Sequence, residues 1–179
     1  MTVQKQFDLE NYLTTGVENI VKGAIKATLK DPKESAFMVS FAAASKKGAS
    51  RRRQWADKGE HIPPFLIASI TSACNLHCSG CYARSNESCV DGLPDCQLTA
   101  EQWLAIFLEA RELGINFILL AGGEPFLRRD IIEAAAKVPE ILFPIFTNGT
   151  MMDEAYLQLF QQCRNLVPIF SIEGDENLT

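Results

Sequence analysis

From Phe65 onward the sequence alternates short apolar runs with longer amphipathic segments, and this alternation constrains the fold more than any other feature. The strand-like runs are Phe65–Ile70, Phe117–Ala121, Leu142–Phe146 and Val167–Ser171. The helical segments are Thr99–Leu113, Ile131–Val138 and a segment from Asp153 to about Cys163. Strands that alternate with helices form parallel sheets with right-handed crossovers, so the pattern predicts an α/β fold.

Local signals place the ends of these segments. Thr99-Ala-Glu-Gln102 has the pattern of a helix capping box, and Gly114 is a typical helix stop. Pro144 and Pro168 weaken the third and fourth strands, because proline has no N–H to donate to a sheet.

The sequence before Pro63 has a different character. Apolar residues between Leu9 and Leu29 recur at spacings of three and four, which predicts one helix. A second helix is expected from about Lys33 to Lys46, and Arg51–Arg53 form a basic run that we expect in a solvated loop or helix end. We therefore divide the chain into a helical extension, residues 1–62, and a core domain, residues 63–179.

Composition excludes several classes of protein. The 179 residues are 47% apolar and 22% charged, as in ordinary globular proteins, and the formal net charge is -5. A general nucleic-acid binder is excluded, since phosphate binding needs a basic surface. No apolar run approaches the roughly 18 residues of a membrane span, and the N-terminus lacks the apolar region of a secretory signal. We expect a cytoplasmic protein, in which six cysteines need a purpose other than disulfides.

Three of these cysteines lie in one short loop. Cys74, Cys78 and Cys81 follow the first predicted strand with the spacing C-x3-C-x2-C. Thiolates so close together in sequence can converge on one soft metal centre.

Three kinds of centre fit this spacing. In a zinc site His77 would supply a fourth ligand, although its spacing does not suit a zinc knuckle. In a ferredoxin-type cluster Cys89 or Cys96 would supply a fourth thiolate. The third is a 4Fe–4S cluster held by three cysteines, which leaves one iron open to a small molecule.

Polar clusters follow all four predicted strands. They are CNLHCSGCY at 74–82, GGEP at 122–125, TNG at 147–149 and SIEG at 171–174. The carboxyl ends of parallel strands are where α/β sheets and barrels build their sites. The pattern therefore predicts one functional site made from all four segments.

The order of these motifs resembles the radical S-adenosylmethionine superfamily. The cysteine loop is similar to that family's C-x3-C-x2-C loop, with Tyr82 as the aromatic residue beside the last cysteine. GGEP, TNG and SIEG look like the family's motifs after its second, third and fourth strands. The resemblance covers about residues 65–174 and implies a partial (β/α) barrel of about four βα units.

The resemblance also implies a role for each matched residue. Cys74, Cys78 and Cys81 would bind three irons of a 4Fe–4S cluster, and the fourth iron would bind the amino and carboxylate groups of S-adenosyl-L-methionine. Glu124 would hydrogen-bond the ammonium group of that cofactor. The full set of implied cofactor-binding residues is Tyr82, Gly122, Gly123, Glu124, Thr147, Asn148, Ser171 and Glu173.

An oxygen-sensitive enzyme is the function that the resemblance implies. The reduced cluster would cleave S-adenosylmethionine to a 5′-deoxyadenosyl radical, which would abstract hydrogen from a substrate. The implied partners are an electron donor of flavodoxin or ferredoxin type and an unknown substrate, for which we favour a peptide. The alternative is an iron–sulfur binding or regulatory module without catalysis.

The sequence departs from the family pattern at its C-terminal end. The family barrel generally has six βα units, and this chain stops at Thr179, just after the fourth predicted strand. We therefore expect the chain to be a fragment or a short form of a longer enzyme, in which strands five and six would complete the cofactor pocket.

Overall fold

The computed structural model describes residues 31–94 and 96–172. The chain divides into two compact units, residues 1–39 and 40–179, and helix α2 (Pro32–Ala56) crosses the boundary. The helix predicted over residues 9–29 lies outside the described residues, and the division at residue 62 into extension and core stays a prediction. None of the described helices is long and apolar enough to span a membrane.

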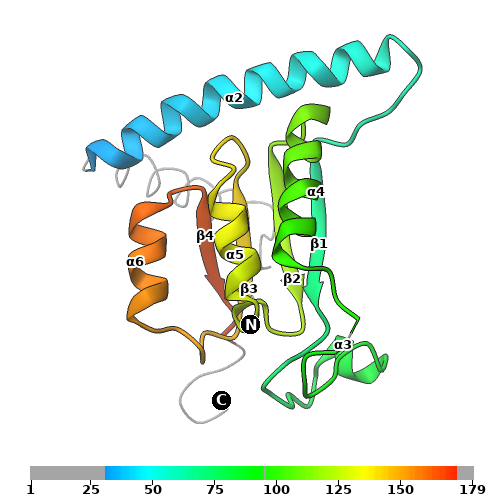
Figure 1. The fold of residues 1–179 in the computed structure, drawn as a ribbon, viewed down its shortest axis with the longest axis vertical. Coiled ribbons are helices and arrows are strands. Elements are labelled where there is room, and N and C mark those ends of the chain that lie inside the picture. The colour runs from blue at the N-terminus through cyan, green and yellow to red at the C-terminus, as the bar shows by residue number, and fades with distance from the viewer. Residues whose placement is uncertain (1–30, 95, 173–179) are drawn as a thin grey trace, which may run out of the picture. The chain divides into compact units, whose positions relative to one another are not determined.

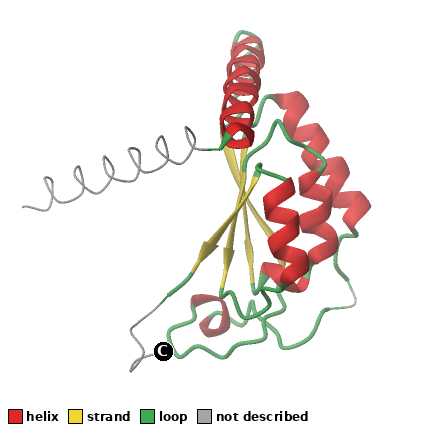
Figure 2. Ribbon diagram, turned by 90° about the vertical axis from the view of Figure 1, so that its left-hand side faces the viewer, coloured by secondary structure: helices red, strands yellow, loops and turns green. Residues whose placement is uncertain are grey.

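The second unit is built on a parallel sheet, as the sequence predicts. Its strands, in spatial order, are β1 (Phe65–Thr71), β2 (Phe117–Gly122), β3 (Phe143–Thr147) and β4 (Leu166–Phe170) (Figure 1). The connecting helices are α4 (Ala100–Leu113), α5 (Arg129–Ala136) and α6 (Glu154–Gln162). These three helices cover one face of the sheet (Figure 2), so the unit is a partial (β/α) barrel.

The hydrophobic core lies between the sheet and the three helices. Alternate strand residues such as Leu120 and Ile145 are fully buried against them and pair in the register of β2 with β3. Phe107 of α4 contacts Phe143 of β3 edge to face, with ring centroids 4.9 Å apart. The period of two along each strand thus sends one set of apolar residues into the core.

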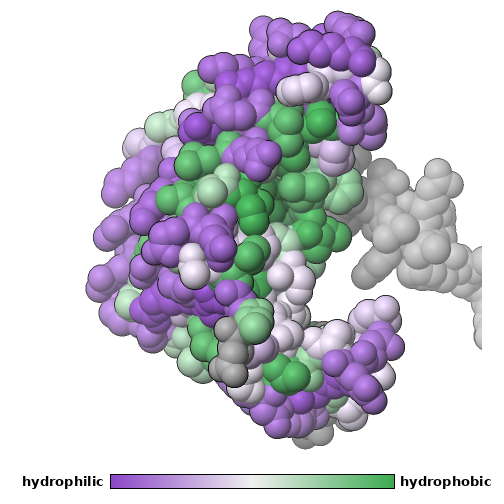
Figure 3. All heavy atoms as spheres, turned by 45° about the vertical axis from the view of Figure 1, so that its right-hand side comes forward, coloured by the Kyte–Doolittle hydropathy of each residue, from purple (hydrophilic) through white to green (hydrophobic). Residues whose placement is uncertain are grey.

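The opposite face of the sheet is apolar but exposed. Ile67, Phe117, Phe146 and Ile169 are each more than a third exposed and alternate with the buried core residues. Apolar side chains gather where the surface is hollowed (Figure 3). In a barrel with its helices outside, this face is the inner one.

Pro144 and Pro168 fit into the sheet because successive residues of a strand direct their backbone nitrogens to opposite sides. Phe143 donates toward β4, to the carbonyl of Asn165 at 2.7 Å, so the nitrogen of Pro144 faces β2. Ser171 donates to Thr147 at 2.9 Å, which directs the nitrogen of Pro168 away from β3, toward the open side of this edge strand. Only the first proline therefore removes a hydrogen bond from the described sheet.

The predicted helix caps are confirmed. The Thr99 side chain accepts from the Gln102 N–H, and the Gln102 side chain accepts from the Thr99 N–H at 2.8 Å, which completes the capping box. Gly114 closes α4 with φ of 94°, in the left-handed region that favours glycine. Asp153 caps α6 through the Tyr156 N–H at 2.8 Å.

Helix α2 is longer than the sequence predicts, because Gly48 does not end it. Gly48 is buried inside the helix, where a Cβ atom would lie only 1.9 Å from Oδ1 of Asn116. The basic run is helical and lies near the end of α2, which is the second of the two positions expected for it. Arg51 donates to the carbonyl of Arg111 at 2.8 Å, and Arg52 to that of Gly114, so the run caps the C-terminus of α4.

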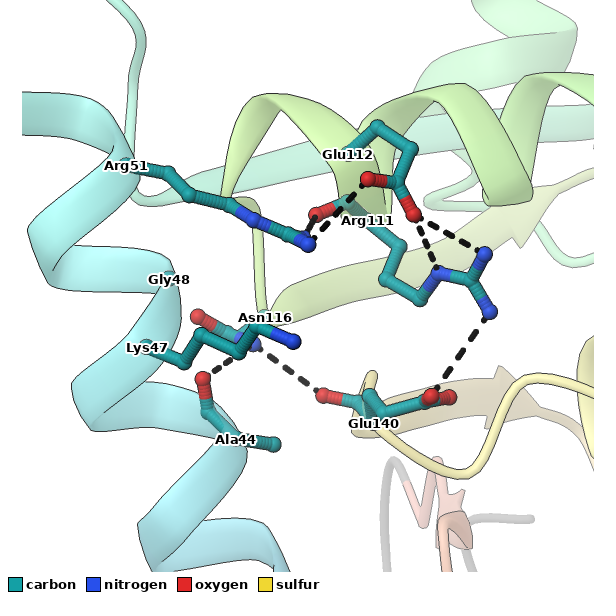
Figure 4. Close-up of a pocket in the computed structure, with 8 residues that line it drawn as sticks. All are labelled: Ala44, Lys47, Gly48, Arg51, Arg111, Glu112, Asn116 and Glu140. Carbon is teal, nitrogen blue, oxygen red and sulfur yellow. Dashed lines mark hydrogen bonds and ion pairs between the residues drawn. The ribbon is translucent and has the colours of Figure 1, made fainter. Parts of the chain in front are cut away.

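A pocket of about 280 Å³ lies beside this helix contact (Figure 4). Asn116 precedes β2 and Glu140 precedes β3, so the pocket is at the amino ends of the strands. Its walls are joined by their own ion pairs, such as Arg111 with Glu140 at 3.6 Å. The amino face of a barrel stabilises the fold, whereas sites lie at the other end.

Replacing Gly48 with alanine should destabilise the protein. Alanine favours a helix over glycine by about 1 kcal/mol, but the added Cβ would overpack Asn116 at a cost of about 1–3 kcal/mol. The free energy of unfolding in urea measures the net effect. Ser50→Ala, at an exposed site of the same helix, is the control and should leave stability unchanged or slightly raised. Equal stabilities for the two variants would contradict the close packing at Gly48.

Candidate functional site

The polar segments after β1, β2 and β3 and the first residues after β4 lie at the same end of the sheet (Figure 2). The cysteine loop follows β1, the GGEP segment follows β2, and the TNG segment follows β3. Ser171 follows β4 and is tied to β3 by its N–H. The predicted gathering of the segments at one edge is therefore present in the fold.

The two glycines of GGEP allow close approach to the start of the cysteine loop. Gly122 has φ of 139°, and a Cβ atom there would lie 2.2 Å from the carbonyl oxygen of Thr71. A Cβ atom on Gly123 would lie 2.0 Å from the carbonyl oxygen of Ala73. The Gly123 N–H donates to Thr71 at 2.8 Å, and the Glu124 N–H donates to Ala73 at 2.7 Å. These glycines are thus required by contacts within the chain itself.

Glu124 is a buried carboxylate that joins two site segments. Its side chain is 1% exposed, which excludes the surface turn that GGEP would also suit. One oxygen accepts from the N–H of Phe126 at 2.9 Å and from the hydroxyl of Thr147 at 2.7 Å. The other accepts from the N–H of Asn148 at 2.8 Å. Three donors within the chain therefore compensate the buried charge.

A second network joins the TNG segment to the cysteine loop. Asn148 donates from its side chain to the oxygen of Asn75, the residue after Cys74, at 3.0 Å. Asn75 donates to the hydroxyl of Thr150 at 2.8 Å, and that hydroxyl donates to Asn148 at 2.7 Å. Asn75 and Thr150 were not among the predicted site residues. The position of Asn75 directly after the first cysteine was the available signal.

The three cysteines of the loop are free thiols. Cys78 is exposed, and Cys74 and Cys81 are half-buried. Within the described ranges, no three His, Cys, Asp or Glu side chains lie close enough together to hold one metal ion. The thiols lie on one loop, and the Leu76 N–H already points at the sulfur of Cys74 at 3.5 Å. The donor set suits a soft centre such as an iron–sulfur cluster, which would require these side chains to turn toward one another.

Cys89 lies beside the loop, whereas Cys96 is exposed and Cys163 ends α6. Burial raises the pKa of the Cys89 thiol, and neighbouring Cys74, with which it shares a hydrogen bond, raises it further. Burial also raises the pKa of Cys163. A raised pKa keeps a thiol protonated, which favours packing over metal binding. The Nε2 atom of His77 lies 2.9 Å from a carboxylate oxygen of Asp91.

The remaining predicted residues occupy different positions. Tyr82 is the first residue of α3 (Tyr82–Ser85), and its ring is 82% exposed. Ser171 is exposed at the end of β4, and Glu173 lies outside the described residues. The sheet thus places Gly122–Glu124 against the residues that lead into the cysteine loop, and Asn148 contacts Asn75 within that loop. Thr147 contacts Glu124, and Tyr82 is exposed.

The family model of the radical SAM superfamily matches residues 68–177, from β1 to beyond β4. That match spans the cysteine loop and all three later motifs. The chain belongs to the radical SAM superfamily. The resemblance inferred from the motifs is confirmed, and so is the partial barrel.

Relatives of this radical SAM chain carry out different reactions. It is 36% identical over 99 residues to the PqqA peptide cyclase of Granulibacter bethesdensis, which covers 54% of the chain and 25% of the relative. It is 31% identical over 120 residues to the sporulation killing factor maturation protein SkfB of Bacillus subtilis, with coverage of 65% and 28%. The Fe-coproporphyrin III synthase of Methanosarcina barkeri is 34% identical over 92 residues, with coverage of 50% and 22%. The matches span about a quarter of each relative.

Two solved structures share the fold. SuiB of Streptococcus suis bound to S-adenosylmethionine has a TM-score of 0.53 at 20% identity, and covers 62% of the chain and 25% of SuiB. SuiB bound to its precursor peptide SuiA has a TM-score of 0.54 at 19% identity, with coverage of 69% and 28%. At these identities the likeness establishes the fold.

Replacing Glu124 with glutamine should destabilise the second unit. The amide NH₂ would face an N–H or hydroxyl donor, and the charge-assisted hydrogen bonds of the carboxylate would be lost, which costs about 1.5–3 kcal/mol. The free energy of unfolding in urea should fall by that amount. Glu133→Gln, at an exposed site on α5, is the matched control. Equal unfolding free energies for the two variants would show that the Glu124 carboxylate does not hold the segments together.

Replacing Gly123 with alanine should also lower stability. Its Cβ atom would meet a backbone oxygen that cannot rotate away, so β1 and β2 would have to separate, at a cost of about 1–3 kcal/mol. Gly80, in the cysteine loop, has nothing within 4 Å of its Cβ position and supplies the control, Gly80→Ala. Thermal unfolding followed by circular dichroism distinguishes the two. A midpoint for Gly123→Ala no lower than that of the control would contradict the close approach.

Proposed function

We propose that this chain provides the cluster-binding and cofactor-binding part of a radical SAM enzyme. Cys74, Cys78 and Cys81 would hold a 4Fe–4S cluster with one iron left for the amino and carboxylate groups of S-adenosylmethionine. When bound, that pair supplies one-electron cleavage of the cofactor and a 5′-deoxyadenosyl radical that abstracts hydrogen.

One observation carries this proposal: the cysteine loop is hydrogen-bonded to both neighbouring motifs. Glu124 donates from its backbone to Ala73, directly before the first cysteine. Asn148 donates to Asn75, directly after it. A site assembled in this way can present thiolates and polar groups to one ligand while its own loops stay fixed.

The residues of the GGEP and TNG segments would form the wall against the methionine end of the cofactor. Gly123 would hold this wall against the start of the cysteine loop, because its missing side chain lets its backbone lie close to Ala73. Glu124 has one acceptor position left on its carboxylate after three internal donors. The ammonium contact we infer for it would use that position, and it requires the segment to open, since the side chain is 1% exposed.

The remaining contacts belong to the edges of the site. Tyr82 would lie against the adenine, and Ser171 and Glu173 would reach the carboxylate and ribose. The exposed apolar inner face of the sheet, which includes Ile67 and Phe117, would exclude water from the substrate side. The polar end and the apolar face would together separate cofactor binding from substrate binding.

A peptide is the substrate class we propose. Two relatives are named for peptide cyclisation and for maturation of a killing factor, and one structural neighbour holds a precursor peptide. A one-electron donor of flavodoxin or ferredoxin type would reduce the site.

Anaerobic incubation with iron and sulfide tests the metal assignment. The protein should become brown with about four irons per chain, as expected for a 4Fe–4S cluster. Cys78→Ala should lose most of this iron, whereas Cys163→Ala, the control, should retain it. Tight binding of zinc by the wild-type protein, undiminished in Cys78→Ala, would overturn the assignment.

The catalytic part of the proposal is tested on the reconstituted protein. Dithionite with S-adenosylmethionine should release 5′-deoxyadenosine and methionine, measured by chromatography. A cluster that is reduced without any cleavage, in a chain extended to six strands, would favour the alternative, an iron–sulfur module that does no chemistry.

A further inference from the structure

We propose that Arg84 is a positioning residue for the cysteine loop, and that its guanidinium both fixes the backbone beside Cys74 and supplies positive charge to the site. This inference rests on the proposed function, in that the loop is taken to hold an iron–sulfur cluster. Arg84 lies in α3, three residues after Cys81. It was not among the predicted site residues.

The guanidinium folds back across the loop that precedes it. Its Nε donates to the carbonyl of Leu76 at 2.8 Å, and Nη2 donates to the carbonyl of Cys74 at 3.2 Å. The third nitrogen pairs with Asp91 at 2.8 Å. The side chain is 19% exposed, although α3 itself has no buried residue. Arginine's planar fork suits several acceptors at once, which a lysine ammonium cannot match in fixed geometry.

Asp91 anchors this arrangement from outside the loop. The same carboxylate oxygen that pairs with Arg84 also accepts from His77 at 2.9 Å. The neighbouring Val90 closes a bridge to the end of β1, because its N–H donates to Ser72 at 2.8 Å and its carbonyl accepts from Cys74 at 2.9 Å. The peptide groups on both sides of Cys74 are therefore held by the segment 84–91.

Arg84 also places a positive charge beside the loop. Its guanidinium donates to the Cys74 carbonyl and interacts electrostatically with Cys74 and Cys89. A positive charge beside a bound cluster favours the reduced cluster, which carries one more negative charge. No lysine or arginine occurs elsewhere between positions 59 and 110, so this loop has no other cation of that kind nearby in sequence.

Two variants separate the fork from the charge. Arg84→Lys keeps the charge and loses the fork, and Arg84→Gln loses both. Both should raise the rate of hydrogen exchange in peptides covering residues 72–92 of the cluster-free protein by about tenfold, since the loss of such hydrogen bonds changes opening equilibria by roughly that factor. The control is Arg111→Gln, whose 30% exposed side chain also forms ion pairs but lies at the other end of the sheet. It should leave exchange in these peptides unchanged.

The effect of the Arg84 charge is measured on the protein reconstituted with iron and sulfide. Arg84→Gln should move the reduction potential of the cluster to a more negative value, whereas Arg84→Lys should leave it close to wild type. Both variants should lose iron to a chelator about tenfold faster than wild type. Asp91→Asn, which removes the anchor and leaves the arginine, is the second variant. It should show intermediate exchange.

The outcomes distinguish this inference from the proposed function. If the wild-type protein binds no iron–sulfur cluster, the proposed function fails, while hydrogen exchange still measures whether Arg84 holds the loop. Wild-type exchange, iron retention and potential in folded Arg84→Gln would overturn the inference. Equal potentials for the Lys and Gln variants would overturn its electrostatic part. If Arg84→Gln does not fold, the exchange results for Arg84→Lys and Asp91→Asn decide between a local clamp and no role.

Discussion

The arrangement of the site depends on the hydrogen bonds that the Glu124 carboxylate accepts. A charged group that is 1% exposed is tolerated only where donors surround it, and here the donors come from its own segment and from the end of β3. Satisfying that one group fixes the distance between two strand ends. The backbone of Glu124 fixes the position of a third strand end, because its N–H donates to the carbonyl of Ala73, which lies between β1 and the cysteine loop. One side chain and its peptide thus align three motifs that are far apart in sequence.

Much of this fold could be predicted because its signals are local. The capping box at Thr99 and Gln102 is a pattern of four residues, and it forms as the sequence indicates. The strands follow from short apolar runs between turns. The end of α2 could not be predicted, because Gly48 is a helix-weakening residue whose presence is explained by its close packing against Gly114 and Asn116, 66 and 68 positions further along the chain. The position of the Arg51–Arg53 run could not be predicted for the same reason. The carbonyl groups that accept hydrogen bonds from this run lie at the end of α4.

The site shows the same division between local and distant information. The cysteine spacing and the glycines could be read as motifs, and the family match confirms the superfamily that they indicate. The motifs assign residue types, but they do not say which groups bind one another. Asn75 and Thr150 complete the contact between the first and third segments, and the sequence does not show that these two residues bind each other. Hydrogen bonds between loops depend on register and strand order, which become known only with the fold.

The two ends of the sheet differ in how their polar groups are satisfied. At the amino ends, Arg111 and Glu140 pair with each other, and α2 covers the carbonyls at the end of α4 beside the pocket described above. At the carboxyl ends, the backbone of each loop is tied down while the Cys78 thiol remains exposed. A fixed backbone with free thiols is the combination that metal binding requires, because ligands must be placed without being consumed by internal contacts. This contrast supports the proposal that the loops at the carboxyl ends are ordered for a ligand as well as for the stability of the sheet.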